Sequence, residues 1–507
     1  MRRVCPIAVA LACFPLALSS PGAAPERWAP ARWQGGPLEA DLRARQTGAK
    51  AGPDTIEALR NWYDLSTLDL LRDTPINCLL VTWSAGGARA LESEQQRIVA
   101  AYAKEAHARG IAVLGVAHPG PDRVRLIESA RAAGLDGLVL EGDFPDARRL
   151  TAAAPFPLIT LGSRGGEDSP VVAIMDGLTP RVRALSEDDA ATATPTSEPW
   201  IDSNTWLVRS LRAADRRPVW LAHTLEKPSV EDYLRAIADA AVAGGRWVVS
   251  PDPELLAGLW RKRPEALAVW RRMAAFLRFF EERAEWRAFE PAGPLGIVYD
   301  RAGPNAEVSA EILNLVARRR IPYRVIPRPS LDAESIRGLV AVLATDLAPP
   351  TGRERELLRW FAEQGGLVVA GPAWSSTPPT GADYVVSAAG KGRLVAYAGD
   401  PPDPEAVSRN MLSLLGRNNI GIRLFNAPSV LCAVSSADSG RRLLVQLTNY
   451  ASMPSEAVTV RVTGDYRAAR LFAPEAPPLE MVPQKLEGAV QVRIRSIPVY
   501  AALLLEK

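Results

Sequence analysis

Short apolar strands and amphipathic helices alternate along the chain from about residue 55 to residue 250. Seven strands are evident, at residues 76–83, 111–117, 138–140, 156–161, 171–175, 218–222 and 246–250. Apolar residues at helical spacing mark residues 92–110, 123–133, 204–214 and 230–243. Continuously apolar strands are typical of a parallel sheet that is covered on both faces. With an eighth strand, which we place at 28–33 in preference to 199–202, the pattern predicts a (β/α)₈ TIM barrel.

Two further domains are expected after the barrel, because 507 residues exceed what one hydrophobic core accommodates. We assign the barrel to residues 25–290. Residues 291–417 again alternate strands and helices, which predicts a flavodoxin-like three-layer α/β domain. Residues 418–507 change to a period of two, with apolar and polar residues in turn, which predicts a small antiparallel β-sandwich.

The N-terminus has the order of a secretory signal peptide. Arg2 and Arg3 precede an apolar segment at residues 4–18, and small residues follow up to Ala24. The apolar segment is too short to span a bilayer comfortably. We therefore expect residues 1–24 to be removed and the mature protein to be secreted or periplasmic.

Charge and histidine content argue against several classes of partner. With 60 basic and 57 acidic residues the formal net charge is +3, which gives no electrostatic reason to expect nucleic acid or a membrane as a partner. The three histidines, His107, His118 and His223, lack the helical spacing of paired metal ligands, so no metal is expected. No dinucleotide-binding glycine pattern follows the strand at 295–299, so no cofactor is expected. The flavodoxin-like domain is expected to have a structural or oligomerising role, which makes a homo-oligomer a candidate assembly.

One predicted strand ends in two carboxylates. Leu138, Val139 and Leu140 form a buried strand, and Glu141 and Asp143 follow it directly. In a (β/α)₈ barrel, catalytic residues collect at the carboxyl ends of the strands, where the following loops form the mouth. The catalytic candidates at these ends are Glu141, Asp143, Asp176 and Glu226, and the candidates for substrate contact are Trp83, His118, Arg164, His223 and Asp252. Paired carboxylates suit glycoside hydrolysis, in which one attacks or stabilises positive charge and the other protonates the leaving oxygen.

The run Asp136-Gly-Leu-Val-Leu-Glu141-Gly142 resembles a fourth-strand motif of barrel glycoside hydrolases such as α-L-fucosidases and α-galactosidases. That motif reads Asp-Gly-aromatic-Phe-Asp-Gly, and its last acidic residue is the nucleophile, so the resemblance implies that role for Glu141. The order of the three domains is also similar to that of β-galactosidases with a trimerisation domain. Those enzymes use a Glu after strand four as acid/base and a Glu after strand seven as nucleophile, which implies an acid/base role for Glu141 and matches Glu226 roughly to the nucleophile.

The two resemblances give Glu141 opposite roles. If Glu141 is the nucleophile, the proton donor is expected from a later strand, with Asp176 ahead of Glu226. If Glu141 is the donor, Glu226 or Asp252 is expected across the ring of strands. Carboxyl groups about 5 to 5.5 Å apart would imply retention and about 6.5 to 9.5 Å inversion of the anomeric configuration. We expect a secreted glycoside hydrolase acting on an oligo- or polysaccharide. The alternative is a non-catalytic glycan-binding or scaffold protein derived from such a barrel, since fold does not prove activity.

Overall fold

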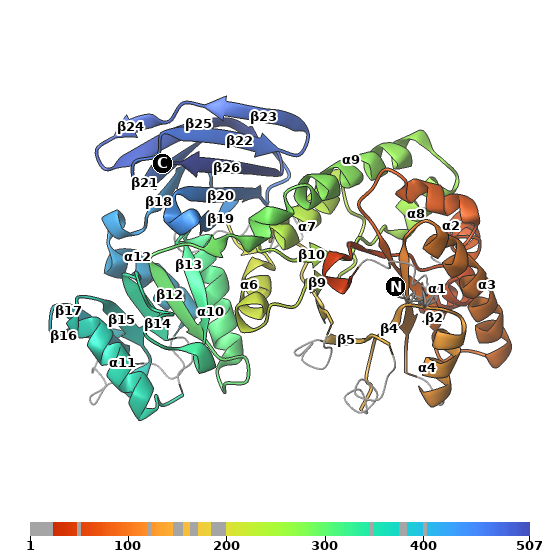
Figure 1. Ribbon diagram of the computed structural model, residues 1–507, viewed down its shortest axis with the longest axis horizontal. Helices are drawn as coiled ribbons and strands as arrows, with labels where there is room; N and C mark the ends of the chain where they lie inside the picture. The colour runs from red at the N-terminus through yellow and green to blue at the C-terminus, as the bar shows by residue number, and fades with distance from the viewer. Residues whose placement is uncertain are drawn as a thin grey trace, which may run out of the picture.

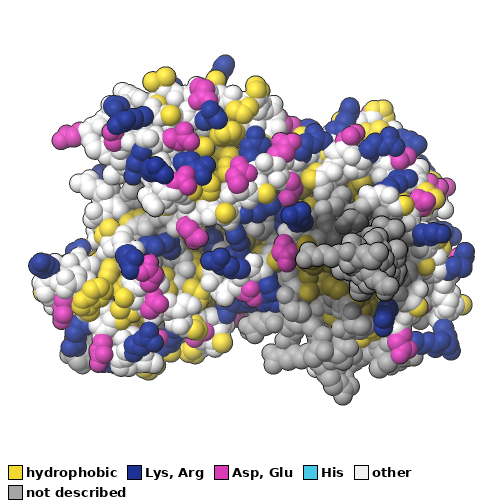
Figure 2. All heavy atoms as spheres, viewed as in Figure 1, with side chains coloured by type: hydrophobic (Ala, Val, Ile, Leu, Met, Phe, Trp, Pro, Cys, Tyr) yellow, Lys and Arg dark blue, Asp and Glu magenta, His cyan; other side chains and the backbone are white. Residues whose placement is uncertain are grey.

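The computed structural model forms three parts, which Figure 1 shows as a barrel, a mostly parallel sheet with helices, and a pair of antiparallel sheets. It describes residues 24–47, 52–119, 123–145, 156–162, 171–183, 199–344, 348–374, 383–398 and 403–507. The segment expected to be a signal peptide lies outside these ranges, apart from Ala24. Figure 2 shows acidic and basic side chains interspersed over the visible face, in keeping with the small net charge.

Eight parallel strands form the barrel, and their spatial order follows the chain. They are β1 (Pro30–Arg32), β2 (Cys78–Ser84), β3 (Ala112–Ala117), β4 (Gly137–Leu140), β5 (Leu158–Gly162), β6 (Ala173–Met175), β9 (Val219–Leu221) and β10 (Arg246–Trp247). The barrel closes through a bridge between Ala31 and Val249, where Arg32 N donates to the Val249 carbonyl at 2.8 Å. The predicted eight-stranded parallel barrel is confirmed, with its extra strand in the preferred segment. The other segment forms β8 (Ile201–Asp202), which pairs with β7 (Arg181–Val182) in a separate two-stranded sheet.

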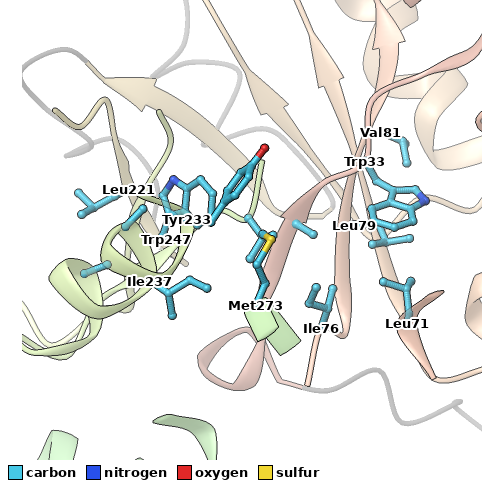
Figure 3. Packing of buried hydrophobic residues seen from close by; sticks show 14 of the residues in the cluster. Trp33, Leu71, Ile76, Leu79, Val81, Leu221, Tyr233, Ile237, Trp247 and Met273 are labelled. Atoms are coloured by element: carbon cyan, nitrogen blue, oxygen red, sulfur yellow. The ribbon is translucent and has the colours of Figure 1, made fainter. Parts of the chain in front are cut away.

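Strand alternation sorts the barrel side chains into an interior and an exterior cluster. Trp28, Leu80, Val139 and Val248 belong to the interior cluster, which fills the barrel. Exterior side chains pack against the surrounding helices, and Figure 3 shows Trp33, Leu79, Val81, Leu221, Tyr233, Ile237 and Trp247 in this cluster. The helices are α1 (Gly36–Thr47), α2 (Pro53–Arg60), α3 (Arg89–Ala108), α4 (Arg123–Ala132), α6 (Thr205–Ala214), α7 (Val230–Ala241), α8 (Pro253–Trp260) and α9 (Pro264–Glu281). Within the described ranges, no helix has the length and apolar character needed to cross a bilayer.

The second part is a six-stranded sheet covered by helices on both faces. Its spatial order is β13 (Tyr323–Pro327), β12 (Leu295–Tyr299), β14 (Ala341–Ala344), β15 (Leu367–Ala370), β17 (Gly392–Tyr397) and β16 (Tyr384–Ala389), and only β16 is antiparallel to its neighbour. One face packs on α10 (Ala306–Arg318) and α12 (Pro404–Leu415), and the other packs on α11 (Gly352–Glu363). Burial on both faces explains why these strands are continuously apolar in sequence.

The third part consists of two antiparallel sheets that share one apolar core. The first sheet contains β11 (Glu290–Pro291), β19 (Val430–Ala437), β20 (Arg442–Asn449), β26 (Tyr500–Glu506), β22 (Ala468–Ala473) and β23 (Ala476–Met481). The second contains β18 (Ile422–Phe425), β21 (Ser455–Thr463), β25 (Ala489–Ile497) and β24 (Gln484–Leu486). Val458, Val460 and Val462 of β21 all point into the core, as their period of two requires.

A buried polar network joins the barrel to the third part. Asp239 of α7 is fully buried and accepts hydrogen bonds from Ser203 Oγ at 2.6 Å and from Tyr450 Oη at 2.5 Å. Its other oxygen accepts from the backbone and side-chain nitrogens of Asn204, both at 2.9 Å. One turn earlier, the guanidinium of Arg235 donates to two carbonyl groups that flank Tyr450 in the chain. These bonds fix how α7 sits against the third part.

Replacing Tyr450 by Phe tests this joint. The substitution keeps the ring and removes the hydroxyl, which bonds to the buried Asp239 carboxylate and lies 3.1 Å from Ser203 Oγ, so we expect the free energy of unfolding to fall by about 2 kcal/mol. Tyr466→Phe is the matched control, because Tyr466 is also buried in the third part and its hydroxyl has no hydrogen bond to any residue that the structure describes. Urea denaturation of both variants gives the comparison. Equal stability of Tyr450→Phe and Tyr466→Phe would show that the hydroxyl of Tyr450 does not stabilise the contact between α7 and the third part.

Candidate active site at the barrel mouth

Glu141 is bound to Arg32 across the mouth of the barrel. Arg32 Nη2 lies 2.5 Å from Glu141 Oε1, and Nη1 donates to Glu141 Oε2 at 3.2 Å. Nη1 also donates to Gln34 Oε1 at 3.2 Å. The two charged side chains are only 16% and 11% exposed, so water screens the ion pair weakly. This is the planar two-bond arrangement in which a guanidinium fixes a carboxylate most firmly.

The positions of both residues follow from the strands that carry them. Arg32 is the last residue of β1, and Glu141 extends β4 by one residue, because its backbone nitrogen donates to the Ala117 carbonyl at 2.9 Å. Side chains two positions apart in a strand point to the same side, so Arg32 shares its side of the strand with Pro30, and Glu141 shares its side with Val139. Val139 faces the barrel interior. β1 and β4 are three strands apart in the order of the sheet. The ion pair therefore crosses the lumen at the carboxyl ends, above the apolar interior.

The turn after Glu141 depends on glycine. Gly142 has a φ of +106°, a conformation that costs a side-chain-bearing residue free energy. A Cβ at this position would also lie 2.9 Å from the ring of Pro119, in the loop after β3. The chain therefore turns sharply, and Asp143 is exposed beyond it.

Three other candidates lie at the same end of the barrel with accessible side chains. Asp176 follows β6 and is exposed, and it lies two positions after Ile174, on the interior side by strand alternation. His118 follows β3 and is half-buried, and Glu226 is exposed in the loop between β9 and α7. The structure thus brings Glu141 and Asp176 to one end and one side of the sheet. The predicted roles of Asp143, Asp176, Glu226 and His118 stay predictions.

Trp83 and Asp252, two candidates for substrate contact, are engaged in packing and in helix capping. Trp83 is 1% exposed and belongs to the exterior cluster, on the same side of β2 as Leu79 and Val81, so its ring packs under the helices. Asp252 is the N-cap of α8, where it accepts from Glu254 N at 2.7 Å, and it also accepts from Tyr233 Oη at 2.5 Å. The structure corrects the prediction for Trp83, because its side chain is buried between the strand and the helices. Asp252 is half-buried, and its predicted role stays a prediction.

The side chain of His223 lies on the outer face of the barrel sheet, and not in the lumen. It is 7% exposed, and its ring lies 5.8 Å from the ring of Trp247, measured between centroids. A Cβ on Gly177 would approach His223 Nδ1 to 2.7 Å, so this contact requires glycine. Neither ring nitrogen has a hydrogen-bond partner among the residues that the structure describes. Burial lowers the pKa of His223 to about 4, so the imidazole is neutral at neutral pH.

The remaining sequence prediction, Arg164, lies outside the described residues. Arg32, by contrast, was missed from the sequence, although the segment 28–33 was expected to be a strand. Its position at the end of that strand, with Gln34 two residues later, is the signal that could have identified it. Among the described residues, no group of three side chains is arranged to hold a metal ion.

No protein-family model and no curated protein sequence matches the chain. Solved structures do match along most of its length. One is α-L-fucosidase isoenzyme 2 from Paenibacillus thiaminolyticus, which is 10% identical with a TM-score of 0.59, and the match covers 87% of this chain and 96% of that one. Another is a GH42 β-galactosidase from G. stearothermophilus, which is 10% identical with a TM-score of 0.54, and the match covers 96% and 98%. At this identity the likeness shows the fold, and it confirms the resemblance to barrel glycoside hydrolases at that level.

The buried imidazole of His223 predicts a pH dependence of stability. As pH falls below about 6.5, the unfolded chain takes up a proton that the folded chain refuses until about pH 4. Folding therefore loses about 3 kcal/mol across this window, and stability is full only above it. His223→Phe should flatten that part of the pH profile, measured by urea denaturation from pH 7 to pH 4.

The control for this pH profile is His107→Gln. A hydrogen bond to Asp136 raises the pKa of His107, so that residue contributes stability below its ordinary pKa and loses it as pH rises. Its removal should leave the loss of stability toward pH 4 in place. A profile that is equally steep in wild type and His223→Phe would show that His223 is not buried in neutral form.

Breaking the Arg32–Glu141 pair from either side should destabilise the fold. Arg32→Met and Glu141→Gln each leave one uncompensated charge or acceptor, so we expect losses of about 3 kcal/mol for each. The double variant should recover at least about 1 kcal/mol of the summed loss, because the two residues act on each other. The exposed pair Arg337–Glu334 is the control, with an expected coupling of no more than about 0.5 kcal/mol. Additive losses at Arg32 and Glu141, measured by urea denaturation, would rule out the pair in solution.

Proposed function

We propose that this protein is a glycoside hydrolase that acts on an oligo- or polysaccharide at the barrel mouth, with Glu141 as its reactive carboxylate. The observation that carries the proposal is the bidentate contact between Arg32 and Glu141 at the carboxyl end of β4. The fold supports it, because the two matched solved structures are named as a fucosidase and a galactosidase. The carboxyl ends of barrel strands are the usual place for such chemistry.

Of the two roles implied for Glu141, the contact with Arg32 favours the nucleophile. Both of its oxygens accept hydrogen bonds from a guanidinium, which suits the ionised carboxylate. A general acid has to carry a proton on one of its oxygens before the glycosidic bond breaks, whereas both oxygens of Glu141 face guanidinium N–H donors. Each carboxylate oxygen keeps lone pairs beyond those that Arg32 occupies, so one oxygen remains able to attack.

Asp176 is the proposed proton donor. It is exposed and lies on the interior side, two strands along the sheet from Glu141. In the proposed reaction Glu141 bonds to the anomeric carbon while the bond to the leaving oxygen breaks, and Asp176 passes its proton to that oxygen. Water then releases the sugar from Glu141 and returns a proton to Asp176. The predicted outcome is retention of the anomeric configuration.

A second function is favoured by the same contact. Because Arg32 occupies both oxygens of Glu141, the site also suits a protein that binds a carbohydrate at the mouth and does not hydrolyse it. The two functions differ in turnover and agree in binding, so activity and affinity have to be measured together.

Export is part of the proposal. The sequence pattern of residues 1–24 is its support, and the cleavage is expected after Ala24. N-terminal sequencing of the protein recovered from the periplasm or medium checks this. A mature chain that still begins at Met1 would contradict it.

Aryl glycosides with good and poor leaving groups test the catalytic roles, starting with α-L-fucosides and β-D-galactosides. Glu141→Gln should lower kcat at least about a hundredfold for every active substrate, while saccharide affinity is kept. Asp176→Asn should lower kcat mainly for poor leaving groups, because only these need the proton. Glu356→Gln, on the exposed face of α11, is the matched control and should retain full activity.

Three outcomes would contradict these assignments. Full turnover by Glu141→Gln would exclude it as the nucleophile. An equal loss for good and poor leaving groups in Asp176→Asn would exclude the proposed donor. Saccharide binding by the wild type without turnover on any substrate in the panel would establish the binding function instead.

A further inference from the structure

A large cavity lies where the three parts of the molecule meet. Its volume is about 1150 Å³, and it is lined by the end of α6, the end of α7, the segment after α9, β13 and the adjoining strands β19 and β20. Figure 2 shows basic side chains gathered in the middle of the molecule, where these elements meet in Figure 1. Because β9 and β10 begin just after α6 and α7 end, the cavity lies at the opposite end of the barrel from Glu141.

The lining is strongly basic. It includes six arginines, Arg209, Arg212, Arg216, Arg283, Arg287 and Arg324, but only two carboxylates, Asp215 and Glu290. Trp286 and Phe289 add aromatic surface. The whole chain is nearly neutral, so this excess of positive charge is a local feature.

Four of these guanidinium groups lack a carboxylate partner. Arg212 donates to the carbonyls of Ala243 and Arg287, at 2.9 and 2.8 Å, and Arg324 donates to the carbonyl of Arg337 at 2.9 Å. Arg209 stacks over the ring of Tyr323, with 4.9 Å between its Cζ and the ring centroid. In the described part of the chain, no carboxylate forms an ion pair with Arg209, Arg212, Arg216 or Arg324.

Burying these positive charges without a carboxylate partner costs free energy. Burial lowers the pKa of Arg212, and the charges of Arg287 and Arg246 lower it further. Burial alone lowers the pKa of Arg324, whose Nε has no partner among the described residues. An anion in the cavity would relieve both penalties, because a guanidinium attracts negative charge and can bind a carboxylate, or two oxygens of a sulfate, through two parallel hydrogen bonds.

We propose that this cavity binds an anionic carbohydrate, carrying carboxylate or sulfate groups, at a site separate from the barrel mouth. The choice of a carbohydrate rests on the proposed function, and the choice of an anion rests on the arginines. The volume of about 1150 Å³ exceeds the usual range for ligand sites, about 300 to 1000 Å³, so the cavity has room for more than one sugar ring. Trp286 offers an apolar face to such rings. The site would hold an acidic chain on the protein at a distance from the reacting carboxylates.

Calorimetric titration of the full-length protein tests this site at low salt. The probes are a trigalacturonate, a sulfated galactose trisaccharide and an uncharged galactose trisaccharide. We expect an acidic probe to bind and the uncharged one to bind at least about tenfold more weakly. The double variant Arg209→Gln/Arg216→Gln should weaken binding of the acidic probe at least about tenfold, because it removes two charged donors. Comparing the two acidic probes identifies the preferred anionic group.

Arg355→Gln/Arg359→Gln is the matched control, since both arginines are exposed on α11 and the charge change is the same. It should bind the acidic probe as the wild type does. Arg216→Gln alone, at an exposed position just after α6, serves as a second variant and should weaken binding by a smaller factor. Glu141→Gln should bind normally, which separates this site from the proposed hydrolysis.

The proposal fails if neither acidic probe binds or if the uncharged trisaccharide binds as tightly. It also fails if Arg209→Gln/Arg216→Gln and the α11 control weaken binding equally. In that case the attraction would come from overall charge, not from the cavity.

Discussion

Closure of the barrel is the constraint from which the candidate site follows. When Ala31 meets Val249, the end of β1 comes within reach of the end of β4, although Arg32 and Glu141 are 109 residues apart in the chain. A charge pair with little water around it gains Coulomb energy and loses hydration, so such pairs are weak evidence for stability. Its place above an apolar interior is therefore more informative about chemistry. Ionised carboxylates held at the mouth of a barrel suit reactions that develop positive charge.

Much of the fold could be predicted because continuous apolar strands and periodic helices are local signals. Because these strands are apolar throughout, the sequence does not show which side chains at the strand ends face the barrel interior. In β2 every residue is buried, so nothing in the sequence distinguishes the interior side of Leu80 from the exterior side of Trp83. A shift of one residue exchanges the two sides, and this accounts for the misplaced Trp83 and His223. For Asp252, the following proline and the α8 helix were a readable capping signal.

For a related reason, only one of the two charged residues of the candidate site could be predicted from the sequence. Glu141 could be found because a carboxylate directly after a buried strand is conspicuous. Arg32 could not be paired with it, because the pairing depends on which strands face each other across the closed barrel. The residues of the basic cavity are also far apart in the chain, since Arg209, Arg283 and Arg324 come from different parts of the molecule. Side chains that assemble through tertiary contacts leave no periodic pattern.

The three parts form one molecule through α6, α7 and α9. Asp239 of α7 binds Tyr450, and Phe280 of α9 packs edge-on against Tyr500, with 4.9 Å between ring centroids. These contacts hold the third part against α7 and α9, on the outer side of the barrel. The basic cavity is lined by residues of all three parts.

Trapping of a glycosyl-enzyme would identify the nucleophile of the proposed reaction. A 2-deoxy-2-fluoro glycoside of the sugar that the protein turns over slows release of the covalent intermediate, and mass spectrometry of the digested protein then locates the label. If Glu141 is the nucleophile, a single sugar is expected on the peptide that contains Glu141, and no label is expected after Glu141→Gln. A label on any other carboxylate, or inactivation without a covalent adduct, would contradict it.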